Sequence, residues 1–565
     1  MTKKINNALE FLPSILVALA LFFYLTGGKI LNVNYYQWLN SLDPSQFFLG
    51  WLFFKNSDFW QNIIGFNPDF GYEITSSIVY TDSIPLLAIL FKIFAKFLPQ
   101  NFQYFGLWIL SCLVLQAIFA MILLKKITPN FATQFIGSLF FILSPILIFR
   151  IFYCHHFSLG GHFLILAALI LYFSKDFLQT RWILLLLVAV GVHFYIFFMI
   201  FLVYLADVMQ RAIFLRPNLD STKLFSKAVF ANINQAAERI FIAIIFILLA
   251  MWQYGYFVVG VQNASSPLFG ETKMNLLSII DSDALWSKII PNQLQGNFEY
   301  EGFAFLGLGI ILMIATIFIV ELFYRKNLVF FNNKLREKRF LPLIFIAILL
   351  TLIALSNRIS IGSTLLIEFK ISDSAHALLG IIRSSGRMFW VVYYLIIIGA
   401  IYAIIKLFKD KANLALTLFF ILQFWDMSNG LKQAKAEMKS VYKNENFFTL
   451  PQSNFWEIAK NKYQKIIFIP VSNDPQKYEP IAYFAATNHL KINSGHVSRY
   501  NKSAQEAANN QHVAEISSGI FDKNALYIFN DEKLWQLAKQ SSANSAFIAQ
   551  IGDYKIIAPE EDLRK

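Results

Sequence analysis

A single acidic residue stands out in the segment that follows the first long apolar run. Asp43 lies in the sequence Asp43-Pro-Ser-Gln-Phe-Phe-Leu-Gly-Trp51. A carboxylate near the level of the lipid headgroups could act as a general base on an acceptor hydroxyl, or it could ligate a metal ion. Its position alone slightly favours a solvated loop acid that helps to set topology. Asp43 is therefore our first catalytic candidate, with a structural alternative beside it.

Asp82 is the second acidic candidate in the same segment, within Tyr80-Thr-Asp82-Ser-Ile-Pro85. Aspartate shortly before a proline is typical of a helix start, where the side chain caps free backbone N–H groups. This capping role explains the residue as well as a catalytic role does. We therefore rank Asp82 below Asp43 as a catalytic residue.

Histidines and an arginine cluster between two apolar runs. Arg150, His155, His156 and His162 lie within thirteen residues. Their spacing matches no standard zinc site, and Gly160-Gly161 argues against one continuous helix that would align His155 with His162. Contacts to phosphate or to sugar hydroxyls are the better chemical interpretation, so we expect all four to bind substrate. A polar membrane edge without a ligand is the structural alternative.

Two arginines, Arg383 and Arg387, precede a later apolar run in the sequence Arg-Ser-Ser-Gly-Arg. Residues four apart can share one face of a helix start, where arginine pairs bidentately with phosphate and the helix N-terminus favours anions. Arginine at the outer end of a span runs against the usual charge bias. We therefore take the pair as a candidate phosphate site, with a simple topology signal as the structural alternative.

An acidic pair, Glu299 and Glu301, leads into another apolar run. Either carboxylate could contact a cation or a sugar, and we take Glu299 as a substrate-binding candidate. Acids before a helix are also stabilising for structural reasons alone, and this second interpretation is slightly favoured.

The composition shows what kind of scaffold must position these side chains. Of 565 residues, 57% are hydrophobic and 15% are charged, and 60 are Phe; soluble chains carry about 25% charged residues. The net charge of +13 comes from Lys and Arg beside apolar runs, as the positive-inside rule requires, so we expect no nucleic-acid partner. Cys112 and Cys154 form no metal or redox motif.

Apolar runs long enough to cross a bilayer recur along the chain. Basic segments between them fall on one side only if 83–98 does not span and 182–206 crosses twice, breaking near His193. The sequence therefore predicts about eleven transmembrane helices, with the N-terminus cytoplasmic. The remaining predicted spans are 9–31, 105–124, 131–151, 158–174, 239–259, 303–324, 340–356, 387–408 and 413–429.

The predicted topology gives a membrane domain of residues 1–430, which includes a large outer loop, 32–104, and an extracytoplasmic C-terminal domain, 431–565. In the loop, 83–98 and the aromatic run 47–54 suit helices lying in the membrane interface, with Trp51 and Trp60 as anchors. The C-terminal domain alternates strand and helix patterns, which predicts a small α/β fold. Its predicted strands are 466–471, 525–529, 546–551 and 554–557, and its predicted helices are 503–516 and 532–539.

This arrangement resembles the GT-C class of membrane glycosyltransferases. The motifs around Asp43, Asp82, residues 103–108 and Arg383-Ser-Ser-Gly-Arg387 are similar to those of an uncharacterised bacterial membrane protein family grouped near that class. The resemblance implies a GT-C-like fold in a bacterial inner (plasma) membrane. It also implies transfer of a sugar, with inversion, from a polyprenyl-phosphate donor to a glycan, lipid or protein acceptor of the cell envelope.

By that resemblance Asp43 matches the acid of the first loop, which acts as base or, in some members, as metal ligand, so a divalent metal ion is left open as cofactor. The chain lacks the adjacent acidic pair of many members, and it has His155-His156 where some have another acid. Two other classes compete: a transporter or flippase of lipid-linked sugars, and a non-catalytic membrane assembly protein. The spans carry almost no charge at mid-bilayer, which disfavours the transporter.

Overall fold

The computed structural model describes residues 9–40, 42–213, 227–293, 296, 298–323, 338–442, 448–542 and 546–559. Lys3-Lys4 and much of the predicted inner loops after 213 and 323 lie outside these residues. The chain forms two compact units. Unit 1 consists of residues 1–30, 105–248 and 265–439, and unit 2 of residues 31–104, 249–264 and 440–565.

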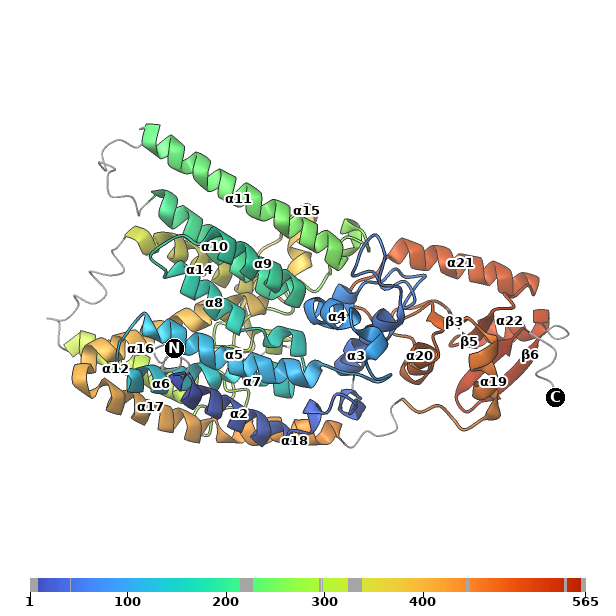
Figure 1. The fold of residues 1–565 in the computed structure, drawn as a ribbon, viewed down its shortest axis with the longest axis horizontal. Coiled ribbons are helices and arrows are strands. Elements are labelled where there is room, and N and C mark those ends of the chain that lie inside the picture. Colours follow the sequence, from blue (N-terminus) through green and yellow to red (C-terminus); the bar gives the residue numbers. More distant parts are fainter. Residues whose placement is uncertain are drawn as a thin grey trace. The chain divides into compact units, whose positions relative to one another are not determined.

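Unit 1 is a bundle of apolar helices (Figure 1). Each predicted span coincides with a helix, or with a pair of helices broken at a proline or at His193. The helices are α2 (Leu12–Thr26), α5 (Phe105–Lys125), α6 (Phe131–Ile142), α7 (Pro145–Ile148), α8 (Phe163–Tyr172), α9 (Gln179–Val192), α10 (Phe194–Ile213), α11 (Lys227–Tyr254, whose last turn belongs to unit 2), α12 (Leu308–Phe323), α14 (Leu341–Leu355), α15 (Asp373–Leu379), α16 (Trp390–Phe408), α17 (Ala412–Asp426) and α18 (Ser428–Val441).

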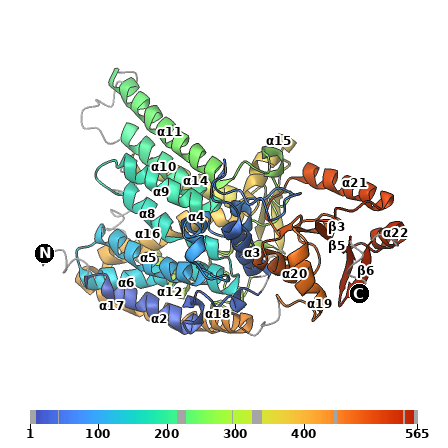
Figure 2. The ribbon, with the colours of Figure 1, turned by 45° about the vertical axis from the view of Figure 1, so that its right-hand side comes forward.

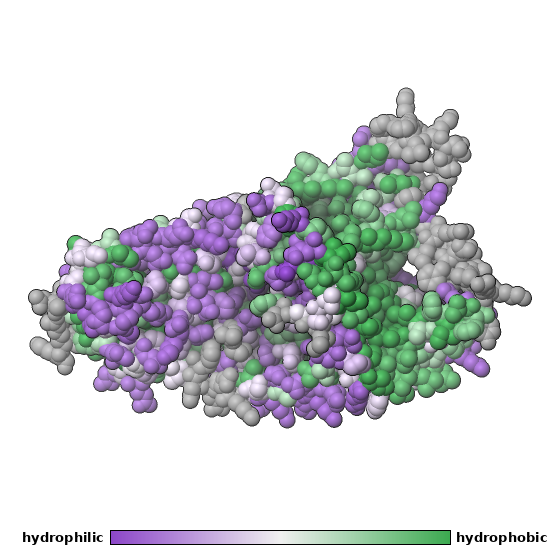
Figure 3. Space-filling model, turned by 180° about the vertical axis from the view of Figure 1, so that it is seen from behind, coloured by the Kyte–Doolittle hydropathy of each residue, from purple (hydrophilic) through white to green (hydrophobic). Residues whose placement is uncertain are grey.

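Length and composition identify fewer certain spans than the eleven predicted. Among the described residues, five helical segments are long and apolar enough to cross a membrane, or six if the pair α6 and α7 counts as one bent span. Four further predicted spans are apolar helices of 10–17 residues: α2, α8 with its preceding turn, α9 and α12. Hydrophobic side chains cover much of the visible surface of the helical part (Figure 3), as expected for a surface in contact with lipid.

The predicted break in the long apolar run 182–206 is confirmed. α9 ends at Val192, His193 adopts an extended conformation, and α10 begins at Phe194. The two helices pack against each other, so the chain reverses direction at His193.

Unit 2 contains the large loop after the first span. Its helices are α3 (Leu42–Asn56) and α4 (Pro85–Lys92). α4 exposes Leu90, Ile93 and Phe97 along it and just after it, as expected of a helix in the membrane interface. The predicted helix over 47–54 is present as part of α3, but its predicted place in the membrane interface is wrong. Trp51 is fully buried and donates a hydrogen bond to the Phe102 carbonyl at 2.8 Å. The aromatic residues of this helix fill a protein core, and Trp51 is no membrane anchor.

A five-stranded sheet forms the rest of unit 2, in the order β4-β3-β5-β7-β6 (Figure 2). β3 is parallel to β4 and β5, while β7 is antiparallel to β5 and β6. The predicted strands are confirmed, and β6 and β7 form a hairpin that turns at Gly552-Asp553. The strands are β3 (Lys465–Ile469), β4 (Lys491–Ile492), β5 (Ala525–Phe529), β6 (Phe547–Ile551) and β7 (Tyr554–Ala558), and the helices are α19 (Asn454–Lys462), α20 (Tyr478–Thr487), α21 (Lys502–Ser518) and α22 (Glu532–Ser542).

The large loop and this sheet belong to the same unit through direct backbone pairing. Tyr72 N–H donates to the Ile492 carbonyl at 3.2 Å, and Ile492 N–H donates to the Asp69 carbonyl at 2.9 Å. Earlier in the loop, the Asn56 side chain donates to the Ala486 carbonyl at 2.7 Å. Residues more than 400 positions apart therefore lie on one side of whatever membrane the helices cross.

Candidate functional site

A buried carboxylate held by two arginines is the main concentration of charge in unit 1. Arg387 donates from Nε and Nη2 to the two carboxylate oxygens of Glu301, at 2.8 and 2.7 Å. Arg150 donates from Nη1 to the same carboxylate at 2.8 Å. The side chains of Arg150, Glu301 and Arg387 are only 0%, 6% and 8% exposed. With one acid between two arginines, the triad carries an excess positive charge.

Local sequence explains how the three segments come so close. Arg150 lies in a π-helical turn, Phe149–Tyr153, which follows the short helix that Pro145 starts; such turns are frequent at functional sites. Gly302 and Gly386 are the neighbours of the other two members, and a Cβ on Gly386 would lie 2.5 Å from the Gly302 Cα. Only glycine lets these two backbones approach this closely, and the approach brings Arg387 onto Glu301.

Further basic side chains border the triad. His156 is near enough to lower the pKa of Glu301. Burial is the main cause that lowers the pKa of His193, and Arg387, His156 and Arg383 lower it further. Burial alone would raise the pKa of Glu301, but Arg387 and Arg150 more than offset it and hold that pKa well below its usual range. The carboxylate is therefore ionised at neutral pH, and the region around it is dominated by cations.

These contacts join turns that the sequence placed on the same face. Arg150 follows α7, His193 separates α9 from α10, Glu301 precedes α12, and Arg387 precedes α16. The structure brings Arg150, His156, Arg383 and Arg387 into one region. The prediction that Arg383 and Arg387 lie on one face of a helix start is wrong, because Arg387 lies in a 3-10 turn, Ser385–Phe389, and α16 begins only at Trp390.

Glu299 lies in a separate network. Its carboxylate accepts hydrogen bonds from Lys273, from the Asn275 amide at 2.8 Å and from the Ser360 hydroxyl at 3.0 Å. Burial acts to raise the pKa of Glu299, yet these partners leave it below its usual value. The arrangement anchors the turn before α12, which agrees with the structural interpretation.

The histidines near Arg150 do not act as one group. His162 is fully buried: its Nδ1 lies 2.8 Å from the Tyr394 hydroxyl, and its ring lies 4.4 Å from that of Trp390. His155 is partly exposed in a left-handed conformation with φ of 57°. The helix does not run through Gly160-Gly161, so His155 and His162 do not align on one face.

A metal ion finds no ready-made site in the part of the chain that the structure describes. There, no three His, Cys, Asp or Glu side chains gather in a way that could hold one. The donor set around Arg150 is cationic, which disfavours a bound cation further. We therefore derive no chemical step through a metal.

Both acidic candidates, Asp43 and Asp82, belong to unit 2. Asp43 lies in the first turn of α3 and is half-buried. Asp82 ends a 3-10 turn, Ile78–Thr81, in a left-handed conformation. Asp82 is not the N-cap residue of α4: that position is occupied by Ile84, whose side chain makes no capping hydrogen bond, and Pro85 begins the helix as predicted.

A second buried cluster of charge, with the opposite sign, lies in unit 2. His512 on α21 is held between two carboxylates, with Nε2 at 2.9 Å from Glu73 and Nδ1 at 2.9 Å from Glu515. The Asn493 side chain also donates to Glu73, at 2.9 Å. Burial acts to lower the pKa of His512, but the two carboxylates raise it above the usual value. The imidazole is thus favoured in its charged form.

Sequence reasoning missed part of both clusters. Glu301 was grouped with Glu299 and not separated from it, and His193 was used only as a turn. A usable signal existed for Glu301: an arginine at the outer end of a span needs an acid from another outer loop. His512 gave no signal, because it lies in a polar helix far in sequence from Glu73.

The fold and these clusters define a helical membrane protein with a small α/β domain and a cationic, buried site at one end of its helices. Residues 15–428 match the family described as domain of unknown function (DUF6311), and residues 455–559 match the DUF6311 C-terminal domain. The chain therefore belongs to the DUF6311 family.

Two solved structures with overall similarity come from the archaeon Archaeoglobus fulgidus. The Archaeoglobus fulgidus oligosaccharyltransferase in its apo form is 11% identical with a TM-score of 0.41, over 98% of this chain and 74% of that one. The AglB enzyme of that organism, in complex with an inhibitory peptide and a dolichol-phosphate, is 10% identical with a TM-score of 0.38, over the same shares. No curated protein matches. Similarity at this level does not identify the activity of this chain.

Proposed function

We propose that this protein is a membrane glycosyltransferase of the GT-C type. It transfers a sugar, with inversion, from a polyprenyl-phosphate donor to a glycan, lipid or protein acceptor of the cell envelope, and the cationic site around Glu301 binds the donor phosphate. The division into a membrane domain, 1–430, and an extracytoplasmic domain, 431–565, is part of this proposal, as is a plasma-membrane location.

The observation that carries the proposal is the Arg150–Glu301–Arg387 triad. Glu301 takes the Nε and Nη2 donors of Arg387 and the Nη1 donor of Arg150, so it fixes the geometry of both guanidinium groups without neutralising both. The phosphate meets the donors that remain and the excess positive charge. His193 and Arg383 add donors at the same place. An anion of one or two negative charges complements such a site, whereas a neutral substrate would leave its excess charge unpaired.

The chemical step assigned to the site needs only groups of this chain and its substrates. The acceptor oxygen attacks the anomeric carbon, the bond from that carbon to the phosphate oxygen breaks, and its electron pair leaves with the phosphate. The arginines stabilise the negative charge that develops on the leaving phosphate. Asp43 takes the acceptor proton as general base, with Asp82 as the second candidate.

The pairing of the large loop with the C-terminal sheet supports the predicted topology. Both segments lie on one side of the membrane, as they must if the chain has an even number of crossings between them. With the positive-inside bias of the connecting loops, this side is the outer one, and the N-terminus is cytoplasmic.

The test uses purified full-length protein in lipid nanodiscs and a labelled polyprenyl-phosphate sugar. We expect release of labelled sugar to be lost in Asp43→Asn and to fall at least about tenfold in Arg387→Lys, because lysine keeps the charge but not the bidentate geometry. Arg358→Lys is the matched control, since Arg358 makes only half-exposed ion pairs with Glu271 and Glu368. Wild-type turnover in a folded Arg387→Lys protein rejects the assigned phosphate site, and wild-type turnover in Asp43→Asn rejects the assigned base.

A further inference from the structure

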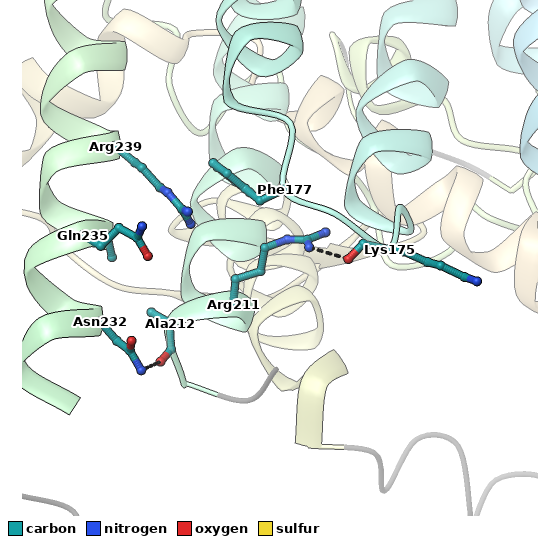
Figure 4. A pocket seen from close by; sticks show the side chains of 8 residues that line it. Lys175, Phe177, Arg211, Ala212, Asn232, Gln235 and Arg239 are labelled. Carbon is teal, nitrogen blue, oxygen red and sulfur yellow. Dashed lines mark hydrogen bonds between the residues drawn. The ribbon is translucent and has the colours of Figure 1, made fainter. Parts of the chain in front are cut away.

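A second basic region lies at the other end of α9 from the Glu301 site. α9 begins beside Phe177 and ends at His193, so its 14 residues separate the two regions by about 20 Å. Here the loop after α8, the end of α10 and the first turns of α11 surround a cavity of about 230 Å³ (Figure 4). A single water needs only ~10–15 Å³ measured in the same way. The cavity therefore has room for a group of several heavy atoms.

The lining of this cavity is polar and cationic. Lys175, Arg211 and Arg239 contribute positive charge, and Asn232 and Gln235 contribute amides. The lining contains no acid among the described residues. Asp207 forms an ion pair with Arg211, and the neighbouring Asp176 and Glu238 are exposed and do not line the cavity. An anion therefore fits the cavity better than a cation or a neutral group.

Two of the cationic side chains are held in place before any ligand arrives. Arg211 donates from Nη1 to the Lys175 carbonyl and from Nη2 to the Ser174 carbonyl, each at 2.8 Å. The guanidinium groups of Arg239 and Arg211 lie 4.3 and 5.6 Å from the Phe177 ring. Such preorganisation lowers the entropy lost on binding.

Asn232 supplies an independent indication of a ligand. Its side chain is 3% exposed and donates to the Ala212 carbonyl at 3.4 Å, but its Oδ1 atom accepts no hydrogen bond within the described residues. A buried acceptor normally has a donor. Figure 4 shows Asn232, Gln235 and Arg239 extending from α11 toward the segments that carry Arg211 and Phe177. A ligand with both an anionic group and a hydroxyl or amine would satisfy the site.

The cavity lies where a helix surface changes from polar to apolar. Beginning two residues beyond Arg239, α11 exposes Phe241, Ile245 and Leu248, at 65%, 42% and 50%. Apolar side chains so exposed on a spanning helix face hydrocarbon, so Arg239 lies at headgroup level.

We infer that this cavity is a binding site for the phosphate of an anionic glycerophospholipid headgroup, with Arg239 and Lys175 on the phosphate and Asn232 on a headgroup hydroxyl. The inference does not rest on the proposed glycosyl transfer. It assigns this end of the helices a lipid contact that is independent of the site at Glu301.

The experiment measures binding of short-chain phosphatidylglycerol to delipidated full-length protein in neutral detergent, by native mass spectrometry. We expect Arg239→Gln to weaken binding at least about tenfold, the loss of one charge-assisted contact, and Asn232→Leu to weaken it by a smaller factor. Arg181→Gln is the matched control, because Arg181 is an exposed cation at the same end that does not line the cavity; it should bind within about twofold of the wild type.

Inorganic phosphate and uncharged diacylglycerol distinguish the source of the ligand. Phosphatidylglycerol binding that phosphate fails to displace supports a lipid headgroup, and displacement by millimolar phosphate supports the same site with a free phosphate as ligand. Equal affinity of folded Arg239→Gln and Arg181→Gln proteins for phosphatidylglycerol overturns the inference. The inference is also overturned if the wild type binds diacylglycerol, which lacks the phosphate, as tightly as it binds phosphatidylglycerol.

Discussion

The two buried charge clusters of this protein have opposite arrangements of charge. In unit 1 a carboxylate, Glu301, is shared by two arginines, and in unit 2 an imidazole, His512, is shared by two carboxylates. The first is the better buried: its members are at most 8% exposed, whereas Glu73 and Glu515 are 20% and 29% exposed. If one charge of the first cluster is removed, water is therefore less able to solvate the partners left behind.

The clusters also respond to pH in opposite directions. The pKa of Glu301 is lowered on folding, so its stabilisation is fully present above the unfolded value near 4.5 and is lost only as pH falls through the folded value. The pKa of His512 is raised on folding, so its stabilisation is fully present below the unfolded value of 6.5 and is lost as pH rises through the folded value. The charges of the arginine cluster therefore stay the same across the physiological pH range, whereas the charge of the histidine cluster changes with pH.

The largest expected effect comes from Glu301→Gln. This change leaves Arg150 and Arg387 buried without their shared counter-charge, which costs about 3–5 kcal/mol. Equilibrium unfolding of unit 1 in mixed micelles measures it. A loss below 1 kcal/mol would show that water reaches the arginines and that the two clusters are alike in burial.

A smaller effect is expected from Gly386→Ala. The new Cβ would lie 2.5 Å from the Gly302 Cα, so the two backbones must separate at a cost of about 2 kcal/mol. The shift also moves Arg387 away from Glu301. We therefore expect the affinity for the polyprenyl-phosphate donor to fall together with the free energy of unfolding. Gly399→Ala is the control, because nothing lies within 4 Å of a Cβ placed there; equal stability of the two variants contradicts the role of the close approach.

His512→Gln tests the histidine cluster. At pH 6 the local opening free energy of α21 should fall by about 1.5 kcal/mol, since glutamine cannot give a charged donor to each carboxylate. As pH rises past 6.5 the wild type should lose this advantage and approach the variant. Hydrogen exchange of residues 502–518 measures both, and a difference that stays constant from pH 6 to 9 would refute a charged imidazole.

The smallest effect is expected from Glu271→Gln, which breaks a surface ion pair. Arg358 and Glu271 are 33% and 48% exposed, so their pairing should contribute about 0–1 kcal/mol. The same unfolding measurement as for Glu301→Gln applies. Together the two variants show how much burial adds to one Arg–Glu contact.

Local patterns were enough to predict most elements of the fold. The β5 strand, 525–529, is a short apolar run between polar segments, and the β6–β7 turn is a Gly-Asp pair, so each is decided by neighbours in sequence. The break at His193 followed from loop charge. The burial of Trp51 did not, because an aromatic helix looks the same whether lipid or protein covers it.

The candidate site was harder to predict because its contacts are distant in sequence. Arg150 and Arg387 were predicted to bind substrate, which stays a prediction, and their contact with Glu301, 151 and 86 residues away, was not foreseen. Nothing local separates Glu301 from Glu299, since both precede α12 and only the Gly302–Gly386 approach decides which one meets Arg387. The roles of Asp43, Asp82 and the histidines in catalysis stay predictions.

The spacing of the triad along the chain has a consequence for biogenesis. Arg150 is synthesised 151 residues before Glu301, and Arg387 follows 86 residues after Glu301. The triad can therefore close only after most of unit 1 has been synthesised, and only from that point can it hold the early and late helices together.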